Sequence, residues 1–155
     1  MSQFSHVDDS GAARMVDVSA KDITVRTATA VGRVSLSPEC VALLRGAGVP
    51  KGDVLAVARV AGIMGAKRTP DLIPLCHPIA LHGVTLDLVV DDDGVAVTAV
   101  ARTADRTGVE MEALTAVTVA CLTVVDMTKA VDPRSTIGGI QVLAKTGGKT
   151  GSWER

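Results

Sequence analysis

Aromatic side chains are almost absent from this chain of 155 residues: Phe4 and Trp153 stand alone, and there is no tyrosine. Hydrophobic residues still make up 47% of the sequence, so the core must be built from valine, alanine, leucine and isoleucine. The length fits one domain, and a domain of this size buries roughly 70% of its unfolded surface. We therefore expect a domain that folds without disulfide bonds or a structural metal.

Cysteine is also scarce, and its spacing excludes a domain held together by disulfides. Cys40, Cys76 and Cys121 are odd in number and far apart, so no disulfide framework is indicated. Free buried thiols in a reducing compartment are the simplest interpretation. The first residues also lack the charged and then apolar pattern of a signal peptide. We expect a cytoplasmic protein.

An excess of charge of one sign is missing, and so is a long apolar run. The formal net charge is −1, which argues against general nucleic-acid binding because such proteins are usually basic. The longest uncharged run of interest, residues 113–125, contains three threonines and is too short and too polar to span a bilayer. We therefore expect neither a nucleic-acid partner nor a membrane partner.

Stretches rich in β-branched residues predict strands, and longer apolar stretches predict helices. Residues 22–37 are predicted to form a long strand, bent near Gly32. Further strands are expected at 84–90, 95–102 and 136–145, and helices after the N-cap Ser37, at 50–68 and at 109–131. This order is the split βαβ pattern. The predicted fold is α+β, a ferredoxin-like βαββαβ sandwich with an antiparallel sheet and helices on one face.

Loose segments are predicted at both ends of this domain. Residues 1–13 are polar and contain serine, aspartate and glycine, which predicts a flexible N-terminal arm. Residues 146–155 are rich in glycine and lysine and predict a mobile tail. Between them, residues 14–145 form a single domain with no internal boundary.

The helix expected at 50–68 is unusually slim. Alanine and glycine recur along it, so it should pack close to a neighbouring element. Asp53 is its expected N-cap. Thr69 followed by Pro70 is expected to stop it, because the residue before a proline disfavours helical backbone.

The helix expected at 109–131 is apolar around most of its circumference, which predicts burial on more than one side. One sheet covers only one side, so we expect an oligomer. Its polar residues Glu112, Thr115, Thr123 and Asp126 share a stripe of roughly 80°, yet the two acids lie about 21 Å apart along the axis. Either the ligand is long, or antiparallel helices of two subunits bring opposite ends together. A solvated surface position is the alternative for each acid.

Cys76 and His77 stand side by side between Pro74 and Pro78. Adjacent side chains rarely bind one metal and usually point apart, which disfavours both a zinc site and a thiol–imidazole catalytic pair. Two interpretations stay open. The loop is either a purely structural one with a hydrogen-bonded histidine, or a rigid one that presents His77 to a pocket.

Three lysines are candidates for work on an anionic ligand. Lys51 precedes a helix N-terminus, where the dipole lowers the pKa of an amine and suits it to acid–base catalysis. Lys145 and Lys149 flank a pair of glycines in a stretch that faintly resembles a phosphate-binding loop. The stretch lacks the first glycine of a Walker A motif, so it does not match that motif. They fit a flexible loop that reaches an anion. The alternatives are a solvated turn lysine and a frayed tail.

Four segments together resemble the cyclic pyranopterin monophosphate synthase family of molybdenum cofactor biosynthesis. They are "MVDVSAK", "PKGDVLAVARVAGIMGAKRTPDLIPLCHP", "TGVEMEALTAVTVACLTVVDMTKAVD" and "LAKTGGKTG", and the resemblance runs from Met15 to Gly151. It implies a hexamer, a trimer of dimers, with the active site at the dimer interface. It also implies that residues 14–145 are a catalytic domain.

The resemblance further implies the reaction. The substrate is 3′,8-cyclo-7,8-dihydro-GTP, supplied by an upstream radical cyclase, and the products are cyclic pyranopterin monophosphate and pyrophosphate. The chemistry implies no redox cofactor and no resident metal, and the need for Mg²⁺ with the triphosphate is left open.

The family's site residues carry over onto matching positions here. The catalytic aspartate falls on Asp126, the lysine of the same motif on Lys129, the lysine of "KGDV" on Lys51 and the loop histidine on His77. Arg26 fits an arginine near the phosphates. Substrate-contacting positions match Leu75, Cys76, His77, Met111 and Glu112.

Two functions of other classes are weighed against the synthase. A non-catalytic carrier subunit would bind the same guanine-nucleotide-derived intermediate but release no pyrophosphate. A purely structural α+β scaffold would not bind the intermediate at all, and this function leaves the "VEMEALTA" stretch unexplained.

Overall fold

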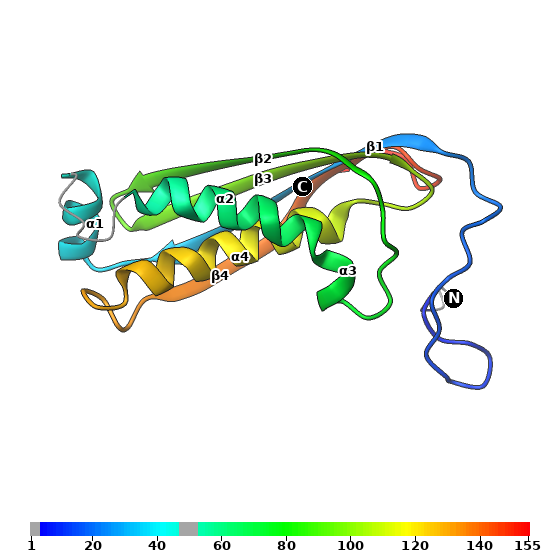
Figure 1. The fold of residues 1–155 in the computed structure, drawn as a ribbon, viewed down its shortest axis with the longest axis horizontal. Helices are drawn as coiled ribbons and strands as arrows, with labels where there is room; N and C mark the ends of the chain where they lie inside the picture. The colour runs from blue at the N-terminus through cyan, green and yellow to red at the C-terminus, as the bar shows by residue number, and fades with distance from the viewer. Residues whose placement is uncertain (1–3, 47–52) are drawn as a thin grey trace.

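A five-stranded antiparallel sheet with helices on one face forms the fold in the computed structural model, which describes residues 4–46 and 53–155 (Figure 1). The strand order β2-β3-β1-β4-β5 contains the split βαβ arrangement and confirms the predicted ferredoxin-like α+β fold. The strands are β1 (Thr24–Ser35), β2 (Leu81–Asp91), β3 (Gly94–Asp105), β4 (Thr136–Thr146) and β5 (Trp153–Glu154). The helices are α1 (Pro38–Arg45), α2 (Val54–Lys67), α3 (Thr69–Leu72) and α4 (Glu110–Thr128).

β1 lies between β3 and β4 and forms the centre of the sheet. Alternate residues from Arg26 to Val34 are buried, as the two-residue period of a strand requires. A Cβ on Gly32 would lie 2.5 Å from Cγ1 of Val117 in α4, so α4 can cross this closely only over a glycine. The register with β4 shifts between Val31 and Arg33, at the place where the sequence predicts a bend.

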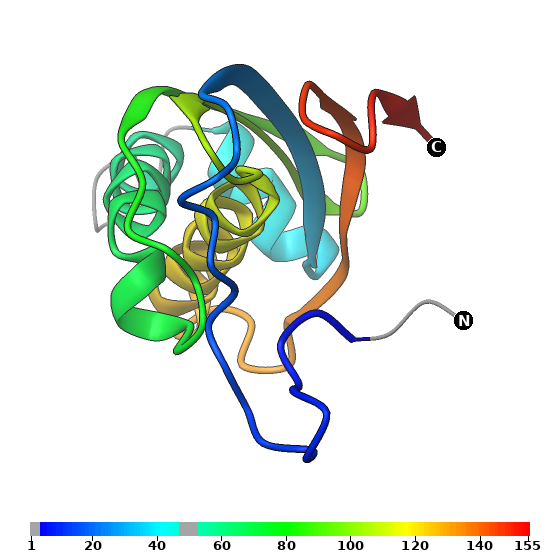
Figure 2. The ribbon, with the colours of Figure 1, turned by 90° about the vertical axis from the view of Figure 1, so that its right-hand side faces the viewer.

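α2 and α4 lie side by side on one face of the sheet (Figures 1 and 2). Asp53 is the N-cap of α2, as predicted. A Cβ on Gly62 would lie 2.8 Å from the carbonyl oxygen of Ala116, and one on Gly65 would lie 2.9 Å from Cβ of Val119. The slim helix therefore packs directly against α4, which confirms the prediction of a close neighbour.

The stop expected at Thr69 and Pro70 is wrong in part. α2 does end at Lys67, but one further helical turn, α3, follows immediately and contains both residues. Pro70 is tolerated because it lies in the first turn, where its missing N–H has no helical acceptor. The hydroxyl of Thr69 donates to the carbonyl of Ala66 at 2.9 Å and stabilises the bend.

α4 is the core helix. By length and composition alone it could cross a membrane, but half of its most apolar stretch is buried inside this fold. It packs on β1, β3 and β4 as well as on α2. Its fully buried apolar residues are Ala113, Ala116, Val117, Ala120, Cys121 and Val124.

The tail contains a strand that the sequence analysis missed. β5 pairs with Ala144 and Lys145 of β4, and the backbone N–H of Arg155 donates to the carbonyl of Leu143 at 2.9 Å. The guanidinium of Arg155 lies 5.9 Å from the centre of the Trp153 ring, a cation–π distance. A two-residue strand has too little periodicity to be predicted. The mobility of residues 146–155 stays a prediction.

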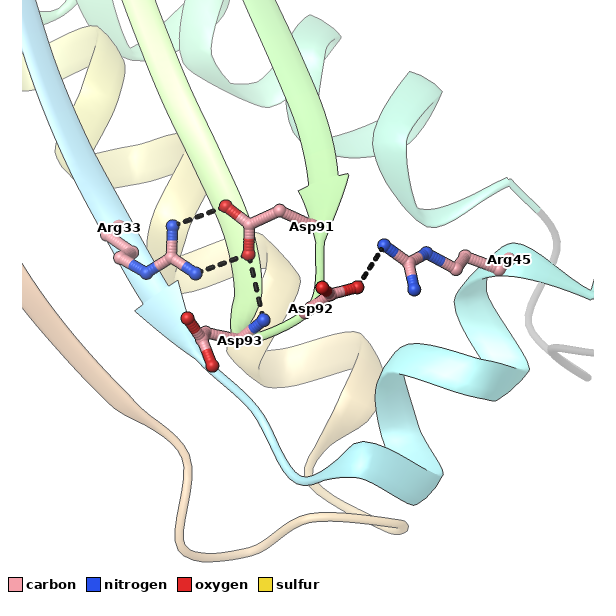
Figure 3. A network of polar contacts seen from close by, with 5 residues as sticks. All are labelled: Arg33, Arg45, Asp91, Asp92 and Asp93. Carbon is pink, nitrogen blue, oxygen red and sulfur yellow. Dashed lines mark hydrogen bonds and ion pairs between the residues drawn. The ribbon is translucent and has the colours of Figure 1, made fainter.

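The turn between β2 and β3 is the hairpin predicted from "DDDG", and it is held by ion pairs (Figure 3). Arg33 of β1 donates two hydrogen bonds to Asp91, at 2.7 and 2.5 Å, and thereby lowers the pKa of that carboxyl. Arg45 of α1 pairs with Asp92 at 2.9 Å. The first pair links β1 to the end of β2, and the second, largely exposed pair links α1 to the turn.

Candidate active site

A hollow lies between the loop that follows α3 and the start of α4. It brings together the predicted contacts of the "LCH" and "ME" motifs, which are separated by more than thirty residues of sequence. The loop is short and proline-bounded, and the backbone N–H of Cys76 donates to the carbonyl of Ile73 at 3.1 Å. The hollow is lined by His6, Leu75, Cys76, His77, Thr107, Gly108, Glu110, Met111 and Glu112.

His77 both lines this hollow and is hydrogen-bonded. Its Nε2 lies 2.6 Å from the carbonyl oxygen of Val16, in the segment that precedes β1. Cys76 is half-buried, and burial, followed by the charge of Glu112, raises the pKa of its thiol. A thiol with a raised pKa is a poor nucleophile. A catalytic thiol is thus disfavoured, and His77 has a feature of each open interpretation, because it is hydrogen-bonded and also lines a hollow.

Glu112 is the most unusual acid of the chain. Only 3% of it is exposed, and burial raises the pKa of its carboxyl to about 7, with a smaller contribution from the charge of Glu110. The alternative of a solvated surface position is thus wrong for Glu112. It also borders a second hollow, so it lines both of them. The second hollow is lined by Ala66, Lys67, Pro70, Pro78, Ile79, Leu81 and Glu112.

Two of the predicted phosphate contacts come from β1 and the end of β4. Nζ of Lys145 lies 3.2 Å from Oε1 of Glu110 and 2.7 Å from the hydroxyl of Thr150. Arg26 is 9% exposed, and its Nε donates to a backbone carbonyl at 3.1 Å. A Cβ on Gly148 would lie 2.3 Å from Nη1 of Arg26.

The tail turn therefore covers the Arg26 guanidinium, and both glycines of this turn have a positive φ that favours glycine. No ion pair with a carboxylate is found for Arg26 among the described residues. A buried guanidinium in that position suits an anionic ligand. Lys149 lies exposed on the same turn.

Asp126 and Lys129 lie at the other end of α4. They form an ion pair of 2.5 Å, with side chains that are 66% and 59% exposed. The two threonines of the polar stripe, Thr115 and Thr123, donate to carbonyls of their own helix and are structural. Lys51 falls outside the described residues. Within one chain the predicted catalytic pair, Asp126 and Lys129, is therefore separated from the hollow by most of the length of α4, about 21 Å by helical rise.

Sequence reasoning missed four residues that line the hollow: His6, Thr107, Gly108 and Glu110. Glu110 had a usable signal, because it stands two residues before Glu112 in the first turn of a helix. Thr107 and Gly108 precede the same turn. His6 had none, because nothing local in a polar arm indicates that it meets a loop 70 residues away.

Comparison with known proteins gives one consistent result. Residues 15–148 match the MoaC family. A protein of Streptomyces coelicolor named cyclic pyranopterin monophosphate synthase is 67% identical over 99% of this chain and 90% of its own length. A protein of the same name from a Nocardioides species is 65% identical over 99% of this chain and 96% of its own. Cyclic pyranopterin monophosphate synthase 2 of Mycobacterium tuberculosis is 58% identical, covering 99% and 92%.

Proposed function

Because this chain belongs to the MoaC family, we propose that it is a cyclic pyranopterin monophosphate synthase of molybdenum cofactor biosynthesis. It converts 3′,8-cyclo-7,8-dihydro-GTP to cyclic pyranopterin monophosphate and pyrophosphate. The observation that carries this proposal is the 67% identity, over nearly the whole of both chains, to a protein of that name. The gathering of the "LCH" and "ME" residues around one hollow supports it from geometry.

The substrate site has two parts, a group of cations for the phosphates and a hollow for the ring system. Arg26, Lys145 and Lys149 bind the phosphates, because a triphosphate gathers cations around it. The ring system derived from guanine lies in the hollow, against Met111 and the loop residues Leu75, Cys76 and His77. Glu112 is buried there with a pKa near neutrality, so it can be present as a carboxylic acid that both donates and accepts hydrogen bonds.

The proton transfers fall to the amines and to the carboxylate at the far end of α4. Lys51 and Lys129 act as acids and bases, and Asp126 holds the Lys129 ammonium in place through the 2.5 Å ion pair. A hydroxyl of the substrate attacks the α-phosphate in line, and pyrophosphate leaves. The chemistry uses no redox cofactor and no resident metal in this proposal.

A shared site requires two subunits. The hollow and the Asp126–Lys129 pair lie at opposite ends of one helix, and the pair is largely exposed. Two antiparallel copies of α4 bring the end of one beside the start of the other. We therefore place the active site at a dimer interface, in a hexamer built as a trimer of dimers. The protein works in the cytoplasm, where an upstream radical cyclase supplies the substrate.

The decisive experiment is a coupled assay for pyrophosphate. Purified protein is given enzymatically prepared 3′,8-cyclo-7,8-dihydro-GTP, and release of pyrophosphate is followed with and without Mg²⁺ and with EDTA. A synthase releases pyrophosphate in step with the loss of substrate. Tight binding of the substrate without any release would instead support the carrier function. A rate that is equal with Mg²⁺ and with EDTA would show that the triphosphate needs no Mg²⁺, and a rate that appears only with Mg²⁺ would show that it does.

A further inference from the structure

The N-terminal arm has a local structure that brings its histidine to a defined place. Oδ1 of Asp8 accepts hydrogen bonds from the backbone N–H groups of Ser10 and Ala12, both at 2.9 Å, and so closes a turn. The backbone N–H of Arg14 donates to the carbonyl of His6 at 2.9 Å. The chain segments before and after the turn are thus hydrogen-bonded to each other, and His6 is part of a small hairpin.

Two contacts attach the segment between the arm and β1 to the rest of the domain beside the hollow. Nε2 of His77 lies 2.6 Å from the carbonyl oxygen of Val16. The guanidinium of Arg106 donates to the carbonyl of Ser19 at 3.0 Å and also to that of Lys21. The first contact comes from the loop that lines the hollow, and the second comes from the residue just before Thr107 on its rim. In Figure 1 the arm leaves β1 at this same end of the molecule.

His6 is the member of the described part of the arm that lines the hollow, where it faces the same space as His77, Glu110 and Glu112. Its neighbour Ser5 does not line it. Nδ1 of His6 lies 3.4 Å from the carbonyl oxygen of Arg14. Nε2, on the opposite side of the ring, is then the nitrogen available to a ligand.

We propose that His6 is a further substrate-binding residue, delivered to the active site by the folded N-terminal arm. This inference rests on the proposed function. His6 makes one hydrogen bond to the substrate through Nε2 and lines the hollow together with the "LCH" loop. His77 then has a second task as a positioning residue, because its contact with Val16 holds the segment that follows the arm against the site.

The kinetic test compares His6→Ala with Ser5→Ala, a neutral change at the neighbouring position. Losing one hydrogen bond to the substrate raises KM roughly three- to tenfold. kcat and the thermal midpoint of His6→Ala should stay at the wild-type values, and Ser5→Ala should match wild type in every respect. A KM of His6→Ala equal to that of wild type overturns the inference, and so does an equal rise in Ser5→Ala.

Proton NMR measures substrate binding at His6 directly. If His6 had a purely structural role, its ring signal would not shift when substrate is added. The chain has three histidines, so the signal missing from a His6→Gln spectrum identifies His6. Substrate is then added to the Asp126→Ala variant, in which turnover is expected to be slow. The His6 ring signal should shift on addition, and an unshifted signal overturns the inference. If wild type itself releases no pyrophosphate, the proposed function fails; if wild type is active and the His6 variants match it, only this inference fails.

Discussion

Near the start of α4 the acid Glu112 is buried, whereas Asp126 near its end is exposed. Glu112 is 3% exposed, and no ion pair is found for it among the described residues, while Asp126 is 66% exposed and paired with Lys129. Burial disfavours the charged form of Glu112, which therefore suits hydrogen bonding to a ring. Asp126 forms a solvated ion pair with Lys129, an arrangement that suits the handling of protons and phosphate. In the proposed function, one helix carries two half-sites of different chemistry, and a second subunit joins them.

The largest expected effect is at the exposed end. Asp126→Ala should lower kcat by roughly a hundred- to ten-thousandfold, because it removes the group that orients a general acid or base. An exposed ion pair contributes little to folding, so the thermal midpoint should barely change. Pyrophosphate release and circular dichroism on the same sample check both points. An active Asp126→Ala variant would leave the far end of α4 without a role.

Mixing two inactive variants tests whether the half-sites come from different chains. Asp126→Ala and Glu112→Ala damage opposite ends of α4, so a mixed dimer contains one intact site and one site with both changes. Coexpression should restore about a quarter of the wild-type activity if the dimer is two-fold symmetric.

The matched control mixes Asp126→Ala with Lys129→Ala. Both changes lie at the same end of the helix, so every shared site is damaged and no activity should return. Recovery in this control, or none in the first mixture, would show that the two ends of α4 do not meet across subunits.

The smallest effect concerns the pH dependence of stability. The folded-state pKa of Glu112 is about 7, above its usual 4.5, so the folded protein binds more protons than the unfolded chain between these values. The free energy of unfolding should therefore fall as the pH rises from about 4.5 to about 7, and level off above. Glu112→Gln keeps the shape but cannot ionise, so this part of the slope should disappear. Urea unfolding at several pH values measures it, and an unchanged slope would place the titrating group elsewhere.

The sequence predicted the long elements well because their signals are local. The alternation of β1, the Asp53 cap of α2 and the apolar α4 each follow from residues within a few positions of one another. The short turn α3 and the two-residue β5 were missed, because each depends on a contact made by the surrounding fold. α3 forms as a direct continuation of the end of α2, and β5 forms by pairing with β4.

Site prediction shows the same division. The polar stripe of α4 predicted an 80° face, but the structure separates its threonines, which bond to their own helix, from its acids. The gathering of Met111 and Glu112 with the "LCH" loop followed from the resemblance and is seen in the hollow. His6 was missed, because its sequence neighbours carry no sign of the distant loop that it faces.

By itself the sequence determined the order of strands and helices, the close-packing surfaces of α2, and the positions of the acids Glu112 and Asp126 on α4. Tertiary structure alone decided that one acid is buried and the other solvated, and that a histidine from the N-terminal arm meets a loop 70 residues later in the chain. The physical reason is that periodicity and capping act between neighbours along the chain. Desolvation and the shape of a cavity depend on which distant elements pack together.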